Sequence, residues 1–182
     1  MKYITFQHDN RNYPTTIPFV FNKGRPRKFF IFGDSYAATY DNFPNINESW
    51  SIKVTDHFNA ASYNWGIPGA SEQSIFYTFA KNINEERDFT IIFHTHPERT
   101  DRFFNLYGLP MSPRFYKKWD DMISFPCLHI YWSRFNYEFK NGKTLISSYP
   151  VNDDDRSINH MSPESNTLLA NTIIDIIEHM LK

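Results

Sequence analysis

KFFIFGDS, residues 28–35, is a short apolar run that ends in glycine, aspartate and serine. The run is too short for a helix and is typical of a strand buried on both faces. Similar runs, FTIIF at Phe89–Phe93 and CLHIYW at Cys127–Trp132, predict two more buried strands, and residues 60–64 predict another. The chain therefore carries strands of the kind found inside a parallel sheet.

Helical patterns separate these strands. They occupy residues 48–58, residues 71–83 with Ser71 as the cap, residues 115–123, and a last segment that starts at Ser162-Pro163. Strands that alternate with helices predict a three-layer α/β/α sandwich with a mainly parallel sheet. The carboxyl ends of parallel strands meet at one edge of such a sheet, where we expect the chemistry to gather.

Two segments fall outside this alternation. Asn141-Gly142 lies between two strand-like runs, residues 137–140 and 143–147, which predicts a β-hairpin added to the core. Residues 95–113 are rich in proline, arginine and aromatic residues without a clear period. That composition predicts a long loop of the size that active sites use.

Length and composition narrow the functional classes. The 182 residues fit a single domain, 1–182, in which residues 1–27 form an N-terminal extension. A formal net charge of -1 offers no broad basic field, so we expect no nucleic acid partner. No apolar segment has the length of a secretion signal or a membrane span, which favours a cytoplasmic location. Abundant phenylalanine, asparagine, isoleucine and tyrosine suggest an AT-rich phage or bacterial source.

Two residues far apart in the sequence have side chains suited to nucleophilic catalysis. Ser35 directly follows the first predicted core strand, so its hydroxyl is expected at the carboxyl edge of the sheet. His160 precedes the last predicted helix, and a histidine on a loop at the same edge can take a proton from that hydroxyl. Either residue alone is better explained as part of an ordinary polar loop, and only the two together favour catalysis.

Three blocks in order give the pattern its specificity, and they resemble the SGNH (GDSL-type) hydrolase family over most of residues 28–182. FIFGDSY resembles the first block, with Ser35 as nucleophile. YNWGIPGAS resembles the second, in which the N–H of Gly69 would join that of Ser35 in the oxyanion hole. SINHMSPESNTLLA resembles the fifth, with His160 as the base. The resemblance implies a flavodoxin-like fold and an acyl-enzyme mechanism.

The chain departs from the family pattern at two places. The third block usually supplies an asparagine to the oxyanion hole, whereas IIFHTHPERTDR has His96 at or near that position. The catalytic acid usually lies three residues before the histidine, where this chain has Ser157. Asp155 or Asp154 could orient His160 if the loop bulges, and a serine–histidine dyad is the alternative.

Further residues are candidates for substrate or metal contacts. We expect Asp34, Arg99 and Arg102 to contact the substrate, the two arginines as a clamp for an anionic or carbohydrate group, although surface ion pairing explains them equally well. His94 and His96 alternate at the end of a strand, which is a weak metal-binding pattern. We expect neither a metal nor an organic cofactor.

The sequence as a whole predicts a serine esterase or acylhydrolase that acts on a small ester, of the carbohydrate O-acetyl or lipid type. The alternative is a catalytically weakened binding module on the same fold, which binds a glycan or a protein partner. A metal-dependent hydrolase that uses His94 and His96 is a third, weaker hypothesis. The oligomeric state stays open.

Overall fold

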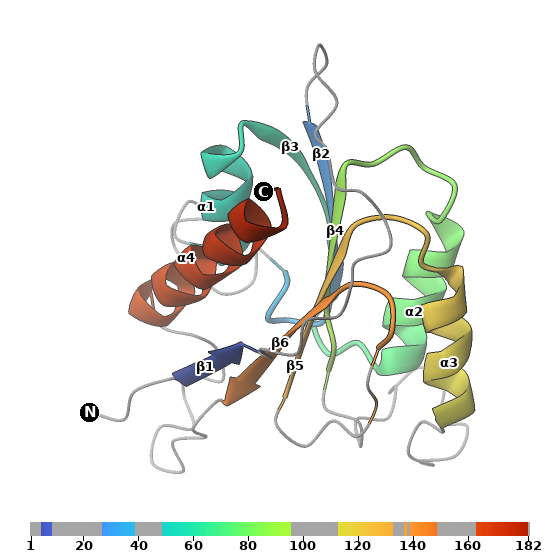
Figure 1. The fold of residues 1–182 in the computed structure, drawn as a ribbon. Helices are drawn as coiled ribbons and strands as arrows, with labels where there is room; N and C mark the ends of the chain where they lie inside the picture. The colour runs from blue at the N-terminus through green and yellow to red at the C-terminus, as the bar shows by residue number, and fades with distance from the viewer. Residues whose placement is uncertain are drawn as a thin grey trace.

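The computed structural model describes residues 5–8, 27–38, 49–95, 113–132, 137, 139–148 and 163–181 (Figure 1). All statements below concern these ranges.

A six-stranded sheet forms the middle layer. Its strands are β1 (Thr5–His8), β2 (Arg27–Gly33), β3 (Ala60–Gly66), β4 (Phe89–Phe93), β5 (Cys127–Trp132) and β6 (Lys143–Ser148), in the order β1-β6-β5-β4-β2-β3. All neighbours pair in parallel except β1 and β6, which are antiparallel. The parallel strands therefore follow the flavodoxin-like order, with the chain reversing direction across the sheet between β2 and β4.

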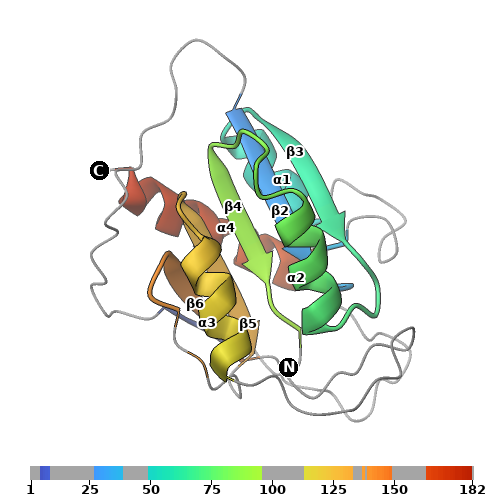
Figure 2. The same cartoon turned by 90° about the vertical axis from the view of Figure 1, so that its right-hand side faces the viewer.

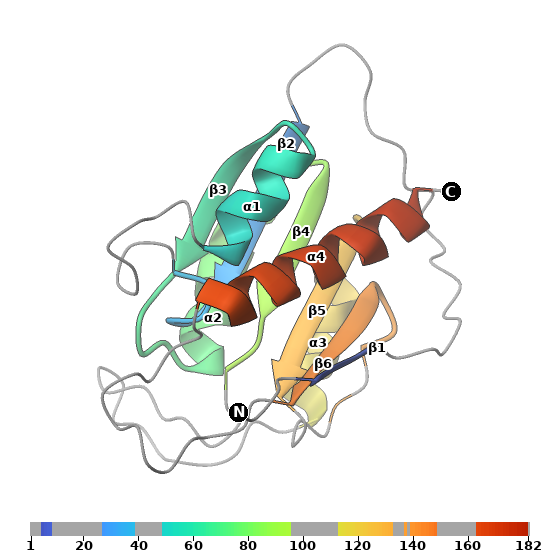
Figure 3. The ribbon, with the colours of Figure 1, turned by 90° about the vertical axis from the view of Figure 1, so that its left-hand side faces the viewer.

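Four helices cover the two faces of the sheet. One face carries α1 (Trp50–His57) and α4 (Pro163–Met180), and the other carries α2 (Glu72–Lys81) and α3 (Pro113–Met122) (Figures 2 and 3). This arrangement confirms the three-layer α/β/α sandwich. Each of the helices and parallel strands that the sequence predicted is present, with ends shifted by a few residues.

Alternation along β2 joins the two hydrophobic cores. Phe29 and Ile31 lie in the core beneath α1 and α4, whereas Phe30 and Phe32 lie in the core beneath α2 and α3. All four side chains are buried because helices cover both faces of this central strand. This double burial explains why the strand reads as a continuous apolar run.

The predicted hairpin is wrong. β6 pairs in parallel with β5, with Leu145 opposite Ile130, and is therefore a strand of the core sheet. Asn141-Gly142 does form a turn, and Gly142 has a φ of 103°. The chain before this turn makes no strand at Tyr137 or Phe139; Phe139 packs instead into the core on the α2 and α3 side.

The N-terminal segment contributes an edge strand. β1 pairs antiparallel with β6, from Thr5 opposite Ser148 to His8 opposite Leu145. Part of the N-terminal extension therefore pairs with the edge of the sheet. Among the described residues, no helix is both long and apolar enough to cross a membrane.

Two neighbouring leucines of α4 test the packing of this layer. Leu169 is 0% exposed and Leu168 is 45% exposed. We expect Leu169→Ala to lower the free energy of unfolding by about 2–5 kcal/mol, since it leaves a cavity in the core. Leu168→Ala should change it by only about 0.5 kcal/mol. Urea denaturation measures both, and equal losses would contradict the assigned helix face.

Candidate active site

The turn after β2 presents Ser35 at the carboxyl edge of the sheet. The backbone amides of Ala37 and Ala38 donate to the carbonyl oxygen of Asp34 at 3.0 and 3.1 Å, which makes a single helical turn. The Asp34 side chain caps this turn because its Oδ1 accepts from the Tyr36 amide at 3.0 Å. Ser35 is thereby held at the start of the turn and is 8% exposed.

Two glycines let this turn lie against the sheet. A Cβ at Gly33 would lie 2.6 Å from the Cβ of Ala37, and one at Gly66 would lie 2.6 Å from the carbonyl carbon of Ala37. Asn64 of β3 adds a hydrogen bond, with its Nδ2 donating to the Ala37 carbonyl at 2.8 Å. The close approach of β3 therefore fixes the far side of the Ser35 turn.

Asp34 also joins β2 to β4. Its carboxylate is 1% exposed, and Oδ2 accepts from the Thr95 hydroxyl at 2.7 Å. Since the carboxylate is buried and both oxygens accept hydrogen bonds within the protein, Asp34 holds the turn in place. The substrate contact that the sequence suggested for Asp34 stays a prediction.

Gly69 lies in a second turn at the same edge. The Ala70 amide donates to the Ile67 carbonyl at 3.0 Å, and Gly69 has a φ of 76°. Pro68 followed by a glycine with positive φ is the pattern of a type II turn. Within the described chain, the Gly69 N–H makes no hydrogen bond, so it is available as the oxyanion donor that the sequence suggested.

A tryptophan connects the Ser35 turn to the start of α4. The indole Nε1 of Trp50 donates to the Tyr36 carbonyl at 2.8 Å, and its backbone amide donates to Oδ1 of Asn166 at 3.0 Å. Asn166 belongs to the first turn of α4, which begins at Pro163. The end of α4 that follows His160 in the sequence is therefore anchored beside the Ser35 turn.

The other candidate residues lie outside the described ranges. They are His160, Asp154, Asp155, His96, Arg99 and Arg102. Their roles stay predictions. In the sequence, His160 precedes Pro163 by three residues and His96 directly follows Thr95.

A row of buried polar side chains, which sequence reasoning missed, lies next to these turns. Nδ1 of His94 is 3.0 Å from Oε2 of Glu72, and Nε2 of His94 is 3.0 Å from Nδ1 of His129. Nε2 of His129 is 3.1 Å from the carbonyl oxygen of Asn141. At its other end, Oε1 of Glu72 accepts from the Thr95 amide at 2.6 Å. We call Glu72, His94 and His129 the acid–imidazole row.

Burial sets the protonation of this row. It raises the pKa of Glu72 well above its usual value, with the Thr95 hydrogen bond opposing. Burial lowers the pKa of His94 to about 3. It also lowers the pKa of His129, and the neighbouring His94 adds to that effect while the Asn141 carbonyl opposes it. Burial therefore disfavours the charged form of each of the three side chains.

The hydrogen bonds of His94 argue against the hypothesis that it binds a metal ion. Both ring nitrogens of His94 make hydrogen bonds inside the protein, so His94 has none to offer a metal ion in this arrangement. Searching the described ranges finds no group of three or more histidine, cysteine or acidic side chains placed to hold a metal.

One signal in the sequence pointed toward the row, and one member of the row gave none. His129 stands inside the apolar strand CLHIYW, and a buried imidazole needs polar partners. Glu72 directly follows the cap Ser71, which is an ordinary place for an exposed acid at a helix start. The sequence does not tell that this acid is buried, because its burial depends on His94 and Thr95, which follow β4 and contact Glu72 across the fold.

Comparison with known proteins identifies the fold. No protein-family model and no curated protein sequence matches the chain. A lipolytic protein of the G-D-S-L family from Desulfitobacterium hafniense DCB-2 has a TM-score of 0.55 at 14% identity, over 82% of this chain and 98% of that one. A carbohydrate esterase whose active site displays divergent catalytic and non-catalytic binding functions has a TM-score of 0.59 at 12% identity, over 88% and 67%.

A third similar structure is a carbohydrate esterase family 2 enzyme with a carbohydrate binding domain, from Corynascus thermopiles (Myceliophthora fergusii). It has a TM-score of 0.61 at 10% identity, over 89% of this chain and 69% of that one. The chain therefore has the SGNH/GDSL-type fold, and its structural neighbours are esterases.

The two glycines at positions 66 and 69 allow a matched test of the site. A methyl group at residue 66 would collide with backbone of the Ser35 turn, so we expect Gly66→Ala to cost about 1–3 kcal/mol of unfolding free energy and to shift the Ser35 amide resonance. At residue 69 nothing lies within 4 Å of the added methyl. Gly69→Ala should cost about 1–2 kcal/mol through backbone strain alone and leave the Ser35 resonance in place. Equal shifts of the Ser35 resonance in both variants would refute the packing described here.

Proposed function

We propose that the chain is a serine esterase or acylhydrolase that cleaves a small ester, of the carbohydrate O-acetyl or lipid type. Ser35 is the nucleophile, His160 its general base, and Asp155 or Asp154 the group that orients His160. The amides of Ser35 and Gly69, together with His96, form the oxyanion hole. Arg99 and Arg102 contact the substrate.

One observation carries this proposal: Trp50 joins the Ser35 turn to the first turn of α4. Its two hydrogen bonds, to Tyr36 and Asn166, hold the helix that follows His160 next to the turn that bears Ser35. The proposed base His160 is only three residues before this anchored helix in the sequence. A serine needs such a base because its hydroxyl is a weak nucleophile at neutral pH.

The chemistry follows from these roles. The Ser35 hydroxyl attacks the ester carbonyl while His160 takes its proton, and the oxygen of the carbonyl becomes negative. Donors placed in advance stabilise that charge without reorganisation, which is the main electrostatic contribution in acyl transfer. His160 then returns the proton to the leaving alcohol, and a water molecule releases the acyl group by the reverse steps.

The competing proposal is a binding module on the same fold. Ser157 stands where the family pattern has its catalytic acid, and a similar carbohydrate esterase has an active site with divergent catalytic and non-catalytic binding functions. In that case the same edge of the sheet binds a glycan or a protein partner, and the Ser35 hydroxyl is not activated.

Hydrolysis of p-nitrophenyl acetate by the purified chain tests the proposal. We expect Ser35→Ala and His160→Ala each to lower kcat/KM by about 1000-fold or more, because removing either member of such a pair disables the other. A chelator should leave the rate unchanged. A fluorophosphonate should label the wild type at Ser35.

Matched controls separate this outcome from general damage. His57 is an exposed histidine that pairs with Glu178 at 2.9 Å, and Ser62 is an exposed serine of β3. His57→Ala and Ser62→Ala should keep the wild-type rate. A wild type that neither hydrolyses the ester nor reacts with the fluorophosphonate, although it is folded, would refute the esterase and support the binding module.

A further inference from the structure

The acid–imidazole row contains three titratable groups that the proposed hydrolysis does not use. His94 and His129 are 0% exposed and Glu72 is 2% exposed, so none can touch a substrate. The row nevertheless connects the loops that carry the proposed site. Glu72 lies three residues after Gly69, and Thr95, which it binds, holds Asp34 beside Ser35.

The two ends of the row fix its proton count. The Asn141 carbonyl can only accept, so Nε2 of His129 carries a proton. The contact between His129 and His94 holds one proton, and so does the contact between His94 and Glu72, since neither pair of acceptors would otherwise approach to 3.0 Å. Three contacts therefore hold three protons. A glutamate and two histidines that share three protons have no net charge.

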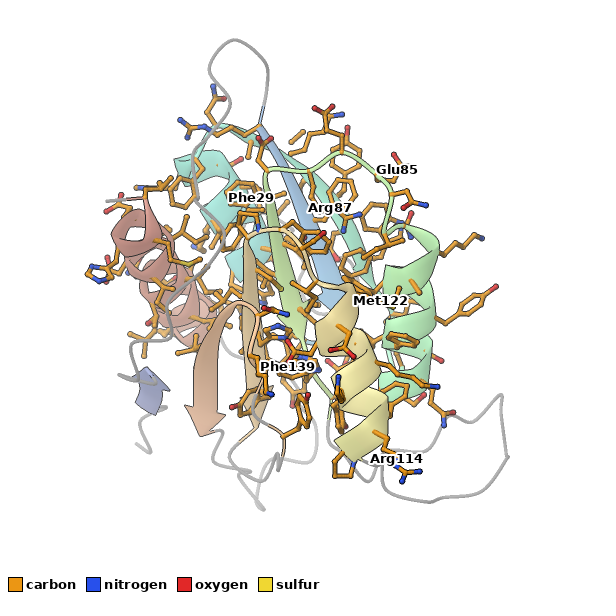
Figure 4. All side chains as sticks on the ribbon, turned by 45° about the vertical axis from the view of Figure 1, so that its right-hand side comes forward. Phe29, Glu85, Arg87, Arg114, Met122 and Phe139 are labelled. Carbon is orange, nitrogen blue, oxygen red and sulfur yellow. The ribbon has the colours of Figure 1, made fainter. Side chains whose placement is uncertain are left out.

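The surroundings decide where the third proton lies. The Phe139 ring stacks on His129 at 3.8 Å between centroids and on His94 at 4.8 Å, and Trp119 packs against His94 at 4.9 Å. Figure 4 shows Phe139 between β5 and α3. Such apolar walls disfavour separated charges. The two imidazole planes differ by only 18° with centroids 5.3 Å apart, so the rings lie edge to edge with the hydrogen bond in their common plane.

The groups around the row have opposing effects on the charge of Glu72. The start of α2 and the Thr95 amide favour a carboxylate at Glu72. Tyr116 of α3 is buried near Glu72. Asp34 accepts a hydrogen bond from the hydroxyl of Thr95, at one end of the row. At the other end, Oδ1 of Asp120 accepts a hydrogen bond from the backbone amide of Asn141 at 2.9 Å. The acidic partners on both sides oppose a second negative charge. The arrangement with the lowest charge is a carboxylic acid and two neutral imidazoles.

We propose that the acid–imidazole row is a neutral, three-proton hydrogen-bond chain, with Glu72 as a protonated acid, which positions the Ser35 turn through Thr95. Both rings carry their proton on Nε2. The row ends in a backbone carbonyl and a backbone amide, so it passes no proton to the substrate. Glu72, His94 and Thr95 are positioning residues for the proposed hydrolase, and this part of the inference rests on that proposed function.

Nitrogen NMR of the imidazole rings tests the protonation independently of activity. At pH 5, 6.5 and 8, we expect both histidines to show a protonated Nε2 and an unprotonated Nδ1, without change. Glu72→Gln should show the same pattern, because an amide can donate to His94 and accept from Thr95 in the way a carboxylic acid does. A doubly protonated ring, or a proton on Nδ1, would overturn the proposal.

The pH dependence of unfolding tests the proton count. Glu72 is protonated in the folded chain and has an ordinary pKa of about 4.3 when unfolded, so unfolding releases its proton at higher pH. Stability from the protonated acid is therefore lost as pH rises. We expect the ratio of the unfolding constants of wild type and Glu72→Gln to rise about tenfold per pH unit above about pH 5. The protonation of the two histidines contributes equally to the unfolding constants of both proteins, so it cancels in the ratio. A flat ratio would overturn the proposal.

Kinetics of three variants test the positioning role. Glu72→Gln should retain kcat within a few-fold, whereas Glu72→Leu should lower kcat about 10–100-fold with little change in KM. Thr95→Val keeps the row but removes the hydrogen bond to Asp34, so it should lower kcat while the imidazole spectrum stays unchanged. Thr95→Val tests the positioning role even if Glu72→Leu does not fold. Unchanged kcat in Thr95→Val would overturn the positioning role.

A buried acid at the opposite edge of the sheet is the matched control. Oδ2 of Asp88 accepts from the Lys28 amide at 2.8 Å, at the start of β2, and the preceding residue Arg87 is labelled at that end in Figure 4. Asp88→Asn and Asp88→Leu should alter stability and leave kcat unchanged. If the wild type lacks esterase activity, the proposed function fails while the NMR and unfolding experiments still decide the row. The Ser35 amide resonance in Thr95→Val then reports on positioning.

Discussion

The hydrogen bonds to the buried carboxylate of Asp34 are the interactions on which the site depends. It accepts hydrogen bonds from the Tyr36 amide and the Thr95 hydroxyl, so one side chain both caps the Ser35 turn and joins it to the end of β4. A buried charge is costly unless its oxygens are satisfied, and these two bonds satisfy one oxygen each. The position of Ser35 is thus coupled to the position of Thr95.

The sheet topology explains why these partners meet. β2 and β4 are adjacent and parallel, and the chain departs from them toward opposite sides of the sheet. Loops that follow such strands diverge and leave space between them for a ligand. Here the Ser35 turn, the turn at Gly69 and the start of α4 lie at that edge of the sheet. An esterase and a binding module can both use it, so the fold alone does not decide between them.

Buried polar side chains form a connected network on the α2 and α3 side of the sheet. The acid–imidazole row runs from α2 through His94, which directly follows β4, to β5, and Asp120 of α3 continues it through its hydrogen bonds to Lys140 and Asn141. Fully satisfied buried networks are rigid because each lost bond exposes an unpaired group to a low dielectric. The row therefore links two helices of one layer to the edge of the sheet where Ser35 lies.

The sequence by itself determined the layers, the central strands and the turn that bears Ser35, because burial on both faces of a strand and the residues Gly33-Asp34-Ser35 leave local signatures. Tertiary structure decided the rest. Lys143–Ser148 has the local pattern of half a hairpin, yet it pairs in parallel with β5. The residue that would have been in the other half, Phe139, is buried in the core on the α2 and α3 side. Glu72 reads as an ordinary acid at a helix start, and only β4 makes it a buried partner of His94. Periodicity reports which face of an element is apolar, whereas the partner of a buried polar group depends on contacts between residues distant in the chain.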